Sequence, residues 1–387
     1  MGNNIVRKLR VLYAEAATGY GGQERYLHRL MLQMRKRGHT VEMLCQPDAQ
    51  LRSYLEQDGF VVHTVPMRKG LCFWKNLIKV TRFLRRNRYD IVNTTSRVDT
   101  LQVGLPARLA KVPLVVRSRH LARPIGSLLS YTWVPQRLIT VSEFVRQQML
   151  AKGINADHIG IVPPAVNLPD PLPQQKLRRE LGLGEEDIVV GSIAVLRRPK
   201  GMGDLINAMV PLLQANACVH LVIVGDGELM PELRLQVKKV ALEKQVHFMG
   251  ERNDIAELIG DFDIFALATH IEASGTAFAE AGAARVPVVG TDVGGVSEMM
   301  DPNKSGLLVP LGDIPALTQA LDKLVSDPEL RARMGDEGYR YSILDKRFVL
   351  ETMGEETEKH YTRWLKKYLE LEVMAGKAKE QPMQRME

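Results

Sequence analysis

The sequence predicts an α/β protein made of two doubly wound, Rossmann-like domains that face each other across a cleft. Short apolar runs alternate with amphipathic stretches along the whole chain of 387 residues, which is typical of strand–helix–strand units in a parallel sheet. A proline-rich stretch interrupts this pattern near the middle of the chain, and the pattern restarts after it. The chain is also too long for one ordinary core and about right for two domains.

Five buried strands are expected in the first half. They are the runs LRVLYAEA, HTVEMLC, YDIVNTTS, PLVVRSRH and RLITVS. Helices are expected between them over 24–37 and about 73–87. The run IVPPAVNLPDPLP then contains five prolines in thirteen residues. Since proline interrupts helices and strands alike, we expect the domain boundary here, between a first domain of residues 1–165 and a second of residues 166–345.

The second half repeats the alternation. Its expected strands are DIVVGSIAVL, CVHLVIVGDG, VHFMG, FDIFALA and PVVGTDVG. Its expected helices follow Gly203, Leu229, Asn253, Thr276, Asp313 and Asp327. Residues 346–372 form a further amphipathic, helical segment. The end of the chain, residues 373–387, is polar and has no core pattern, so we expect it to be disordered.

Composition limits the class of protein. Hydrophobic residues make up 45% and charged residues 25% of the chain, as in a soluble globular protein. No apolar run approaches the roughly 18 residues that span a bilayer, and the first residues lack the apolar core of a secretion signal. Three widely spaced cysteines fit neither a disulfide framework nor a zinc site. These features together predict a cytoplasmic protein.

The charge is unevenly distributed between the two halves. Residues 1–170 contain 26 Lys and Arg against 11 Asp and Glu, a balance of +15, whereas the remainder contains 26 basic and 34 acidic residues, a balance of −8. Basic surfaces attract phosphates on nucleotides, nucleic acids or anionic lipids. An ordinary solvated surface is the alternative, but the size of the difference favours an anionic partner for one face of the first half.

The first candidate binding segment is the glycine-rich turn TGYGGQERY. Ligands of doubly wound sheets bind beyond the carboxyl ends of the strands, where the chain turns into a helix. Gly19, Gly21 and Gly22 would let the backbone approach a ligand, and the following helix offers free N–H groups. Glu24 stands where the dinucleotide fingerprint requires a glycine. A tight turn without a ligand explains the glycines equally well.

A second candidate lies after the first strand of the second half, in LRRPKG. Arg197, Arg198 and Lys200 suit a diphosphate, which arginine binds through paired hydrogen bonds and lysine as a point charge. A solvated basic loop is the alternative, and the position after a strand favours phosphate binding. The later Gly225-x-Gly227 is a weak signal, because Met230 replaces the third glycine of a nicotinamide-binding motif.

The most informative segment is EASGTAFAE, in which two carboxylates bracket seven small or apolar residues. Ser274, Gly275 and Thr276 are typical of a helix start, so Glu272 precedes the helix and Glu280 lies about one turn inside it. The two acids would flank an anion at the helix N-terminus and contact different hydroxyl-bearing parts of one ligand. This spacing suits a glycosidase pair poorly. No Asp/His cluster accompanies them, so no metal site is expected.

His120 ends the run PLVVRSRH, also at the carboxyl end of a strand. A lone histidine is more often a packing or capping residue than a catalyst. The predicted position of His120, in the first domain and across the cleft from Glu272, makes a catalytic role about equally plausible.

These motifs resemble, in order and spacing, those of the retaining glycosyltransferases of family 4, which have the GT-B fold. The resemblance covers nearly the whole chain and rests on Glu-x7-Glu, the VPVVGTDVGGVSEMM that follows it, KGMGDLINA, VIVGDGEL and the early GGQE. It implies that the first domain is the acceptor side and that the second binds a nucleotide sugar. It also implies that no cofactor is needed beyond this donor and that nucleic acid is not a partner.

The resemblance further implies a role for each site residue of the second domain. Glu272 would contact hydroxyls of the donor sugar and Glu280 the ribose, while Lys200 and Arg197 would bind the diphosphate. There are departures from the family pattern: Ala-Ser follows Glu272 where Gly-Phe is usual, and Val195 stands where the family has an arginine. VPPAVN replaces the common Pro-Asn-Gly-Val-Asp.

In the first domain, the resemblance implies that Gly21 and Gly22 approach the donor phosphates and that His120 faces the transferred sugar. The implied reaction moves a sugar from a nucleoside diphosphate to an acceptor hydroxyl with retention, and the acceptor is expected to be a lipid-linked or cell-envelope glycan. The alternatives are a sugar-nucleotide epimerase of the same fold and a catalytically silent subunit that binds nucleotide sugars.

The expected helix 73–87 carries a basic stripe. Lys75, Lys79, Arg82 and Arg86 follow one another at helical spacing. A neighbouring, mostly apolar stripe consists of Trp74, Leu77, Ile78, Thr81 and Leu84. An ordinary helix with a solvated basic face explains the spacing, but the charge of the first half and the lipid-linked acceptors of many family 4 enzymes favour peripheral binding to the inner face of an anionic membrane.

Overall fold

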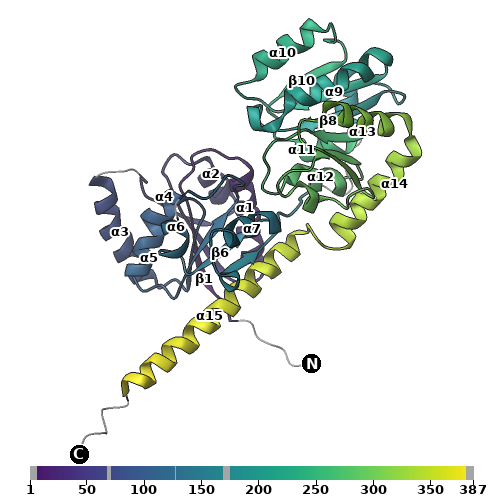
Figure 1. Ribbon diagram of the computed structural model, residues 1–387. Helices are drawn as coiled ribbons and strands as arrows, with labels where there is room; N and C mark the ends of the chain where they lie inside the picture. The colour runs from purple at the N-terminus through teal and green to yellow at the C-terminus, as the bar shows by residue number, and fades with distance from the viewer. Residues whose placement is uncertain (1–6, 68–70, 127, 169–174, 381–387) are drawn as a thin grey trace, which may run out of the picture. The chain divides into compact units, whose positions relative to one another are not determined.

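The computed structural model describes residues 7–67, 71–126, 128–168 and 175–380. The chain divides into two compact units, each with its own parallel sheet (Figure 1). Unit 1 comprises Met1–His120, Pro124–Val162 and Leu350–Glu387, and unit 2 comprises Leu121–Arg123 and Pro163–Val349. We describe each unit by itself.

Unit 1 contains a sheet of seven parallel strands in the order β3-β2-β1-β4-β5-β6-β7. Its strands are β1 (Arg10–Glu15), β2 (Thr40–Cys45), β3 (Val61–Thr64), β4 (Ile91–Thr94), β5 (Leu114–Arg119), β6 (Arg137–Thr140) and β7 (Ile159–Ile161). Its helices are α1 (Gly22–Lys36), α2 (Gln50–Gln57), α3 (Leu71–Asn87), α4 (Arg97–Asp99), the π-helix η1 (Thr100–Gly104), α5 (Leu105–Leu109), α6 (Leu129–Thr132), α7 (Glu143–Leu150), the 3₁₀ turn η2 (Ala156–His158) and α15 (Leu350–Glu380).

Unit 2 contains six parallel strands in the order β10-β9-β8-β11-β12-β13. Its strands are β8 (Ile188–Ile193), β9 (Val219–Val224), β10 (Val246–Gly250), β11 (Ile264–Leu267), β12 (Val288–Thr291) and β13 (Gly306–Val309). Its helices are α8 (Lys176–Leu181), α9 (Met202–Ala215), α10 (Met230–Lys239), α11 (Ile255–Leu258), α12 (Thr276–Ala283), α13 (Ile314–Ser326) and α14 (Pro328–Tyr339), with the shorter turns η3 (Arg198–Lys200), η4 (Ile259–Asp261), η5 (Val296–Met299) and η6 (Arg340–Leu344).

When the strands of each unit are numbered along the chain, the six strands of unit 2 have the same order as the first six strands of unit 1. In each, the order reverses between the first and the fourth strand, namely β1 and β4 in unit 1 and β8 and β11 in unit 2. This reversal is the topological switch point, and the loops that follow those two strands diverge there and leave room for a ligand. The fold therefore directs attention to four loops, two in each unit.

Burial explains why the strands are so apolar. In β1, residues 11–14 are completely buried, because a parallel sheet in an α/β unit is covered by helices on both faces. The predicted strands and the helices expected after Leu229, Thr276, Asp313 and Asp327 are all present. The sequence analysis missed β3, β7 and β13, which are only three or four residues long and lie near turn residues.

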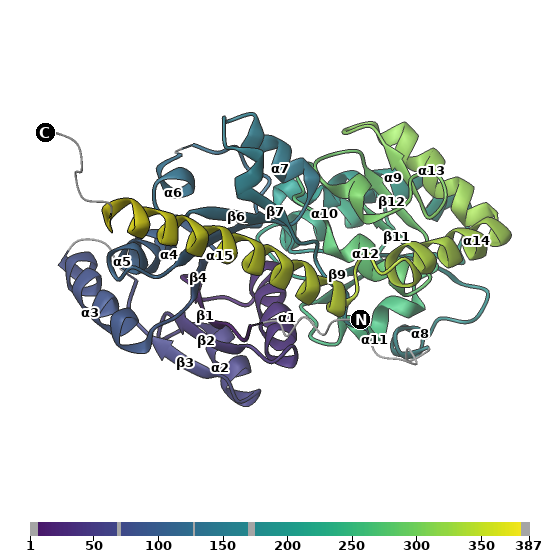
Figure 2. The ribbon, with the colours of Figure 1, turned by 90° about the horizontal axis from the view of Figure 1, so that it is seen from below.

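The C-terminal helix α15 packs on unit 1, although its sequence follows that of unit 2. Tyr361 is buried in the sheet face and accepts a hydrogen bond at Oη from the Asn93 amide (2.6 Å). Glu358 accepts one from His39 at 2.9 Å. Figure 2 shows α15 lying across the first sheet. The chain thus returns to the first unit after it completes the second.

The prediction that residues 373–387 form a disordered tail is wrong for its first part. The helix begins at Leu350 and continues to Glu380, whereas the sequence analysis ended it at residue 372. The segment MAGKAKE is rich in Ala, Lys and Glu, which are good helix formers even without an apolar face to bury. Residues 381–387 lie outside the described residues.

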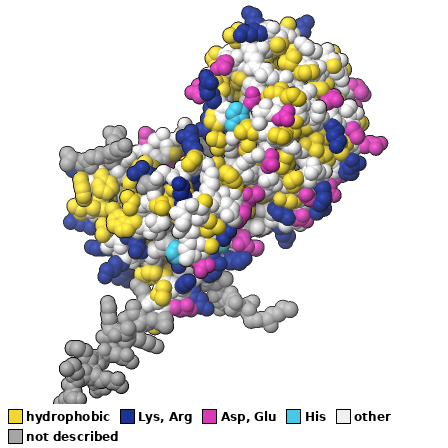
Figure 3. Space-filling model, in the orientation of Figure 1, with side chains coloured by type: hydrophobic (Ala, Val, Ile, Leu, Met, Phe, Trp, Pro, Cys, Tyr) yellow, Lys and Arg dark blue, Asp and Glu magenta, His cyan; other side chains and the backbone are white. Residues whose placement is uncertain are grey.

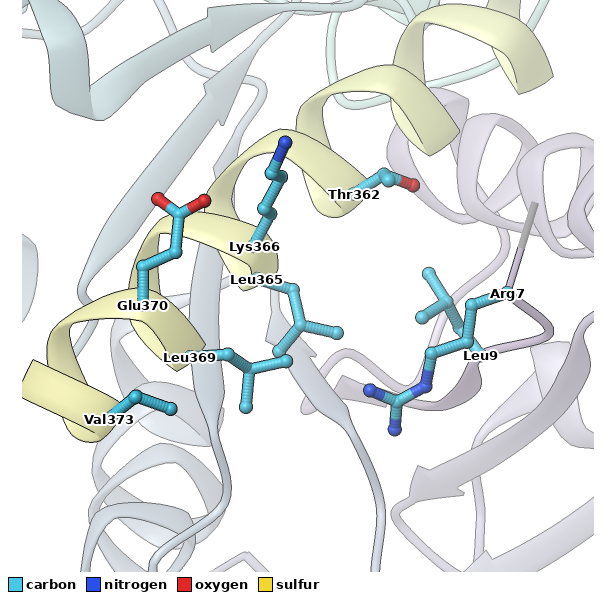
Figure 4. Close-up of a pocket in the computed structure, with 8 residues that line it drawn as sticks. All are labelled: Arg7, Leu9, Thr362, Leu365, Lys366, Leu369, Glu370 and Val373. Atoms are coloured by element: carbon cyan, nitrogen blue, oxygen red, sulfur yellow. The ribbon is translucent and has the colours of Figure 1, made fainter. Parts of the chain in front are cut away.

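A groove of about 630 Å³ lies between α15 and the start of β1 (Figure 4). It is lined by Arg7, Leu9, Thr362, Leu365, Lys366, Leu369, Glu370 and Val373. Leu9 precedes β1, so the groove lies at the amino edge of the first sheet, opposite the edge where ligands of doubly wound sheets bind. We therefore assign it no part in the chemistry.

Candidate functional site

An ion pair lies at the switch point of the second sheet. Lys200, in the loop after β8, contacts Glu272, in the loop after β11, with 2.5 Å between Nζ and Oε2. The side chains are 18% and 15% exposed, so both are sheltered but accessible to a ligand. The sequence analysis selected these two residues separately, and the fold brings them together.

The two loops that carry this pair are fastened to each other. The carbonyl oxygen of Pro199 accepts a hydrogen bond from the His270 amide at 2.8 Å and from Thr269 Oγ1 at 3.0 Å. Gly201 has φ +61°, and a Cβ there would lie 1.7 Å from the carbonyl oxygen of Ala268. Only glycine fits this contact, and the Lys200 loop is therefore held directly against the carboxyl end of β11.

Glu272 is also fixed through its backbone. Its carbonyl oxygen accepts a hydrogen bond from the Gly295 amide at 3.2 Å. A Cβ on Gly294 would lie 1.9 Å from the same oxygen, and this glycine has φ +60°. The loop after β12 thus sets the position of Glu272. The motif that contains this loop was recognised in the sequence, but its contact with Glu272 was not predicted, because that contact depends on β11 and β12 being neighbours.

Helix α12 begins next to this pair. Gly275 precedes its first residue, Thr276, and adopts φ +80°. Ser274 is buried, and Glu280 lies in the second turn of the helix and is half-buried. The free N–H groups of the first turn and the helix dipole favour an anion here. The local structure agrees with the predicted helix start, and ligand contacts of these residues stay a prediction.

Two arginines extend the positive charge of the Lys200 loop. Arg197 precedes the 3₁₀ turn η3 and Arg198 begins it, and both side chains are exposed. Among the described residues, neither guanidinium takes part in a hydrogen bond or an ion pair. Nearby, Nε2 of His270, in the loop after β11, lies 2.6 Å from Oδ2 of Asp204, in the first turn of α9. The edge of unit 2 therefore has cations available for an anionic ligand.

In unit 1, the predicted glycines lie at the start of α1. Gly21 precedes the helix, and its amide donates to Glu24 Oε2 at 2.8 Å. Gly22 is the first helical residue, and a Cβ there would have no atom within 4 Å. The backbone at Gly22 is thus open, whereas the Gly21 amide is engaged by Glu24. That Gly21 and Gly22 approach the donor phosphates stays a prediction.

Two fully buried carboxylates lie at the switch point of the first sheet. Glu15 ends β1, and Asp99 lies after β4. The hydroxyl oxygen of Thr95 lies 2.7 Å from Oε2 of Glu15 and 3.1 Å from Oδ2 of Asp99. Burial, and next the charge of Glu15, raise the pKa of Asp99 to about 7. Asp99 also accepts a hydrogen bond from the Ala16 amide at 3.2 Å. These acids hold the glycine loop and are not open to a ligand.

His120 follows β5 and packs edge-to-face on Tyr26, with 4.5 Å between ring centroids. Its Nε2 is buried without a hydrogen-bond partner among the described residues. Burial lowers the pKa of His120 to about 4, so the ring is neutral near pH 7. His120 belongs to unit 1 and Glu272 to unit 2, and the prediction that His120 faces the transferred sugar stays a prediction.

The described residues contain no group of three or more His, Cys, Asp or Glu side chains that could hold a metal ion. Over the same parts of the chain, no helix combines the length and apolar character that a membrane span requires.

The exposed face of α3 is both basic and apolar. Lys75, Lys79, Arg82 and Arg86 are exposed. Trp74 and Ile78, of the neighbouring apolar stripe, are 63% and 54% exposed. Thr81 and Leu84 are buried instead. Figure 3 shows hydrophobic and basic side chains together at the side of unit 1 where α3 lies.

Two family models together match most of the chain. Residues 20–169 match the model described as Glycosyltransferase Family 4, and residues 173–341 match the model described as Glycosyl transferases group 1. The chain belongs to the family 4 type of glycosyltransferases. The resemblance inferred from its motifs is confirmed.

The chain is similar to several named proteins of bacteria. Putative glycosyltransferase EpsD of Bacillus subtilis (strain 168) is 27% identical over 72% of this chain and 80% of its own length. UDP-Gal:alpha-D-GlcNAc-diphosphoundecaprenol alpha-1,3-galactosyltransferase of Escherichia coli is 27% identical over 75% of this chain and 81% of its own length. The match to N-acetyl-alpha-D-glucosaminyl L-malate synthase of Bacillus anthracis is 30% identical but spans only 44% of either chain.

Solved structures confirm the GT-B fold. A glycosyltransferase from Rickettsia africae ESF-5 gives a TM-score of 0.81 at 20% identity, with 93% of this chain and 99% of that chain covered. Anabaena Alr3699/HepE, solved in complex with UDP and glucose, gives 0.79 at 22% identity, with 91% and 98% covered. At such identities the likeness concerns the fold alone.

Proposed function

We propose that this glycosyltransferase is a retaining enzyme that transfers a sugar from a nucleoside diphosphate sugar to the hydroxyl of a lipid-linked or cell-envelope glycan. The observation that carries the proposal is the ion pair between Lys200 and Glu272 at the switch point of unit 2. A cation for a diphosphate and a carboxylate for sugar hydroxyls stand side by side, as the two halves of such a donor require.

The pair also suggests how the donor is received. Without a ligand, each charge is compensated by the other. A bound diphosphate would replace Glu272 as the partner of Lys200, and the carboxylate would then be free to accept hydrogen bonds from the sugar. Arg197 and the N-terminus of α12 add positive potential beside it. Glu280, one turn inside α12, is placed in this proposal at the ribose.

In the proposed reaction, the bond between the anomeric carbon and the diphosphate oxygen breaks while the acceptor oxygen forms a bond to the same carbon. Negative charge then develops on the diphosphate, and Lys200 and Arg197 stabilise it. The acceptor proton passes to a diphosphate oxygen on the same face of the sugar, which accounts for retention. His120, neutral because it is buried, would orient the sugar as a hydrogen-bonding group without charge.

Two observations support a lipid-linked acceptor. The Escherichia coli relative is named for transfer to a diphosphoundecaprenol-linked sugar. In this chain, α3 has no Asp or Glu and presents Trp74 and Ile78 beside its basic residues, a composition typical of helices that lie in a membrane interface. We therefore propose that α3 contacts the anionic inner face of a membrane and keeps the enzyme near its acceptor.

The test begins with donors. A panel of UDP-, GDP- and other nucleotide sugars is screened for thermal stabilisation, since a ligand that binds only the folded protein raises the unfolding temperature. The donors found are then incubated with lipid-linked acceptors, and the anomeric configuration of the product is assigned by NMR. A product with the donor's configuration supports the proposal. An isomerised donor without transfer would show an epimerase, and binding without any reaction would show a silent binding subunit.

A further inference from the structure

The segments that carry Lys200 and Glu272 are joined by a hydrogen bond as well as by their ion pair. The hydrogen bond links His270 and Asp204, with 2.6 Å between Nε2 and Oδ2. His270 lies in the loop after β11, and Asp204 lies in the first turn of α9. The proposed reaction uses the ion pair, whereas it gives no role to His270 or Asp204.

His270 holds the turn that contains Lys200 from both sides. Its backbone N–H donates to the carbonyl oxygen of Pro199, just before Lys200, at 2.8 Å. Its side chain reaches Asp204, after Lys200, and an ionised carboxylate can only accept, so His270 donates its Nε2–H there. Lys200 and Gly201 thus lie between two attachments to one residue of the neighbouring loop.

The ring of His270 lies close to the backbone of this turn. A Cβ on Gly201 would be 3.3 Å from His270 Cδ2, so the glycine lets the ring approach. The side chains of His270 and Asp204 are 43% and 35% exposed, and an exposed pair of this kind adds little to the stability of the fold. Its effect is geometric, because it limits how far the first turn of α9 can move from the loop after β11.

The ion pair cannot keep the two loops together once a donor is bound. In the proposed function, the diphosphate replaces Glu272 as the partner of Lys200, and Glu272 turns to the hydroxyls of the sugar. The attraction between the two side chains is then lost at the stage when their separation has to match the donor. The His270–Asp204 pair includes neither of these charges, so donor binding leaves it intact.

We propose that the His270–Asp204 pair keeps Lys200 in position relative to Glu272 after the donor has separated their ion pair. The inference rests on the proposed function, because it needs a diphosphate at Lys200. His270 and Asp204 are positioning residues, since they act through the Lys200 turn and do not touch the reacting atoms. Their loss should lower the stabilisation of the leaving diphosphate in the transition state more than it weakens binding of the donor.

The kinetic test compares His270→Ala, Asp204→Ala and the double variant. Each single variant should lower kcat by about tenfold, because a small displacement of Lys200 weakens its interaction with the leaving group. The donor KM should change by less than about threefold. The double variant should resemble the single variants, since all of them lack the same contact. His270→Gln, whose side-chain amide can still donate to Asp204, should retain more than about a third of the wild-type kcat.

Asp187→Ala is the matched control. It removes a carboxylate that faces another histidine of unit 2, with 3.4 Å between His220 Nε2 and Asp187 Oδ1. Asp187 precedes β8, so this pair lies at the amino edge of the sheet, away from the edge where ligands bind. The kcat and the donor KM of Asp187→Ala should stay within about twofold of wild type.

Amide hydrogen exchange over residues 199–204 supplies a readout that does not depend on catalysis. Without ligand, His270→Ala should exchange like wild type, because the ion pair still joins the loops. With saturating UDP or GDP, whichever stabilises wild type, it should exchange about threefold faster than liganded wild type. Faster exchange by the same factor in both states would show that His270 only supports the fold, and would overturn the inference.

A comparison without ligand separates this inference from the proposed function. Glu272→Ala removes the ion pair in the absence of a donor, so the double variant Glu272→Ala/His270→Ala should exchange faster over residues 199–204 than the product of the two single effects. If wild type transfers no sugar from any donor, the proposed function fails, and this comparison still decides whether the two contacts hold the Lys200 turn jointly.

Three further results would overturn the inference. They are a kcat of His270→Ala within about twofold of wild type, additive losses of kcat in His270→Ala/Asp204→Ala, and exchange in Glu272→Ala/His270→Ala that is no faster than in Glu272→Ala alone.

Discussion

The switch points of the two sheets have the same topology but opposite chemistry. In unit 2, Lys200 and Glu272 form an ion pair that is partly exposed. In unit 1, Glu15 and Asp99 are two carboxylates without exposed surface, and their hydrogen bonds are used by the loops around them. The Lys200–Glu272 pair is accessible to a ligand, whereas Glu15 and Asp99 hold the backbone of the loops around them.

This difference teaches that strand order alone does not identify a binding site. Both units fulfil the topological rule for ligand binding, yet the Lys200–Glu272 pair of unit 2 is partly exposed, whereas Glu15 and Asp99 of unit 1 are buried. Unit 1 offers backbone groups instead, at the N-terminus of α1. We infer that unit 2 supplies the cations and the carboxylate for the donor, whereas the two buried acids of unit 1 hold its own loops. The predictions below test this division.

Lys200→Ala should have the largest effect. It removes the cation that the account places against the developing charge of the leaving diphosphate, so kcat should fall about a hundredfold or more. Lys304→Ala, which breaks the surface pair with Asp301, is the control and should be close to wild type. Steady-state kinetics measure both. A loss in Lys200→Ala of less than fivefold would mean that unit 2 does not supply the essential cation.

Gly294→Ala should separate the position of Glu272 from its chemistry. The new Cβ would lie 1.9 Å from the Glu272 carbonyl oxygen, and the loop must shift to relieve this clash. We expect kcat to fall roughly tenfold or more, while circular dichroism shows a folded protein. Gly312→Ala is the control: Gly312 also has positive φ, but its Cβ would meet no atom. Equal activities of the two variants would contradict the role given to the loop after β12.

Glu272→Ala and Glu280→Ala should differ from each other. Glu280→Ala should weaken binding of the bare nucleoside diphosphate by about tenfold, because the account places this carboxylate at the ribose. Glu272→Ala should reduce kcat and leave that affinity within about threefold, because its partner is the sugar. Isothermal titration calorimetry separates the two variants, and equal losses of nucleotide affinity would refute the assignment.

The basic face of α3 provides a test outside the donor site. Lys75→Glu/Lys79→Glu should weaken binding to anionic vesicles by about thirtyfold or more, since each basic residue near such a surface contributes about 1 kcal/mol. Lys238→Glu/Lys239→Glu, on the exposed surface of α10 in unit 2, is the matched control and should bind like wild type. Co-sedimentation at low and high salt checks this. Wild type that ignores anionic vesicles at low salt would show that α3 is an ordinary solvated helix.

The smallest expected effect is that of His120 on the pH dependence of the free energy of unfolding. The folded protein holds the pKa of His120 at about 4, below the 6.5 of an exposed histidine. The unfolded chain therefore binds a proton that the folded chain does not, and stability falls as the pH falls from 6.5 to 4. The loss reaches roughly 3 kcal/mol at most. His120→Gln should reduce this loss in thermal unfolding, and an unchanged pH dependence would contradict the burial of the ring.

The sequence predicted the fold, and it made Lys200 and Glu272 candidate site residues, for a physical reason. Strands of a parallel sheet are apolar along their whole length, so their ends are visible in the sequence, and Lys200 and Glu272 both follow such ends. Gly294 and His270 could not be selected in this way. Their roles depend on which strands are neighbours, and that becomes known only when β8, β11 and β12 are assembled.

Surfaces were harder to predict. Helical spacing identified the stripes of α3, but it did not indicate which side chains of the apolar stripe are exposed, as Trp74 and Ile78 are. The helix over 373–380 was missed because this segment has no apolar core pattern in the sequence. Both results have one cause. Hydrophobic periodicity predicts which face of a helix packs, and it says little about a segment without an apolar pattern or about an apolar side chain that stays exposed.

The most direct test of the central claim uses amide hydrogen exchange with the bare nucleoside diphosphate. The account predicts that the ligand protects residues 196–202 and 268–277 of unit 2, the two loops that carry Lys200 and Glu272, and that Lys200→Ala removes this protection at the same ligand concentration. Protection confined to unit 1, without change in those two segments, would show that the nucleotide binds elsewhere and would contradict the division between the two sheets.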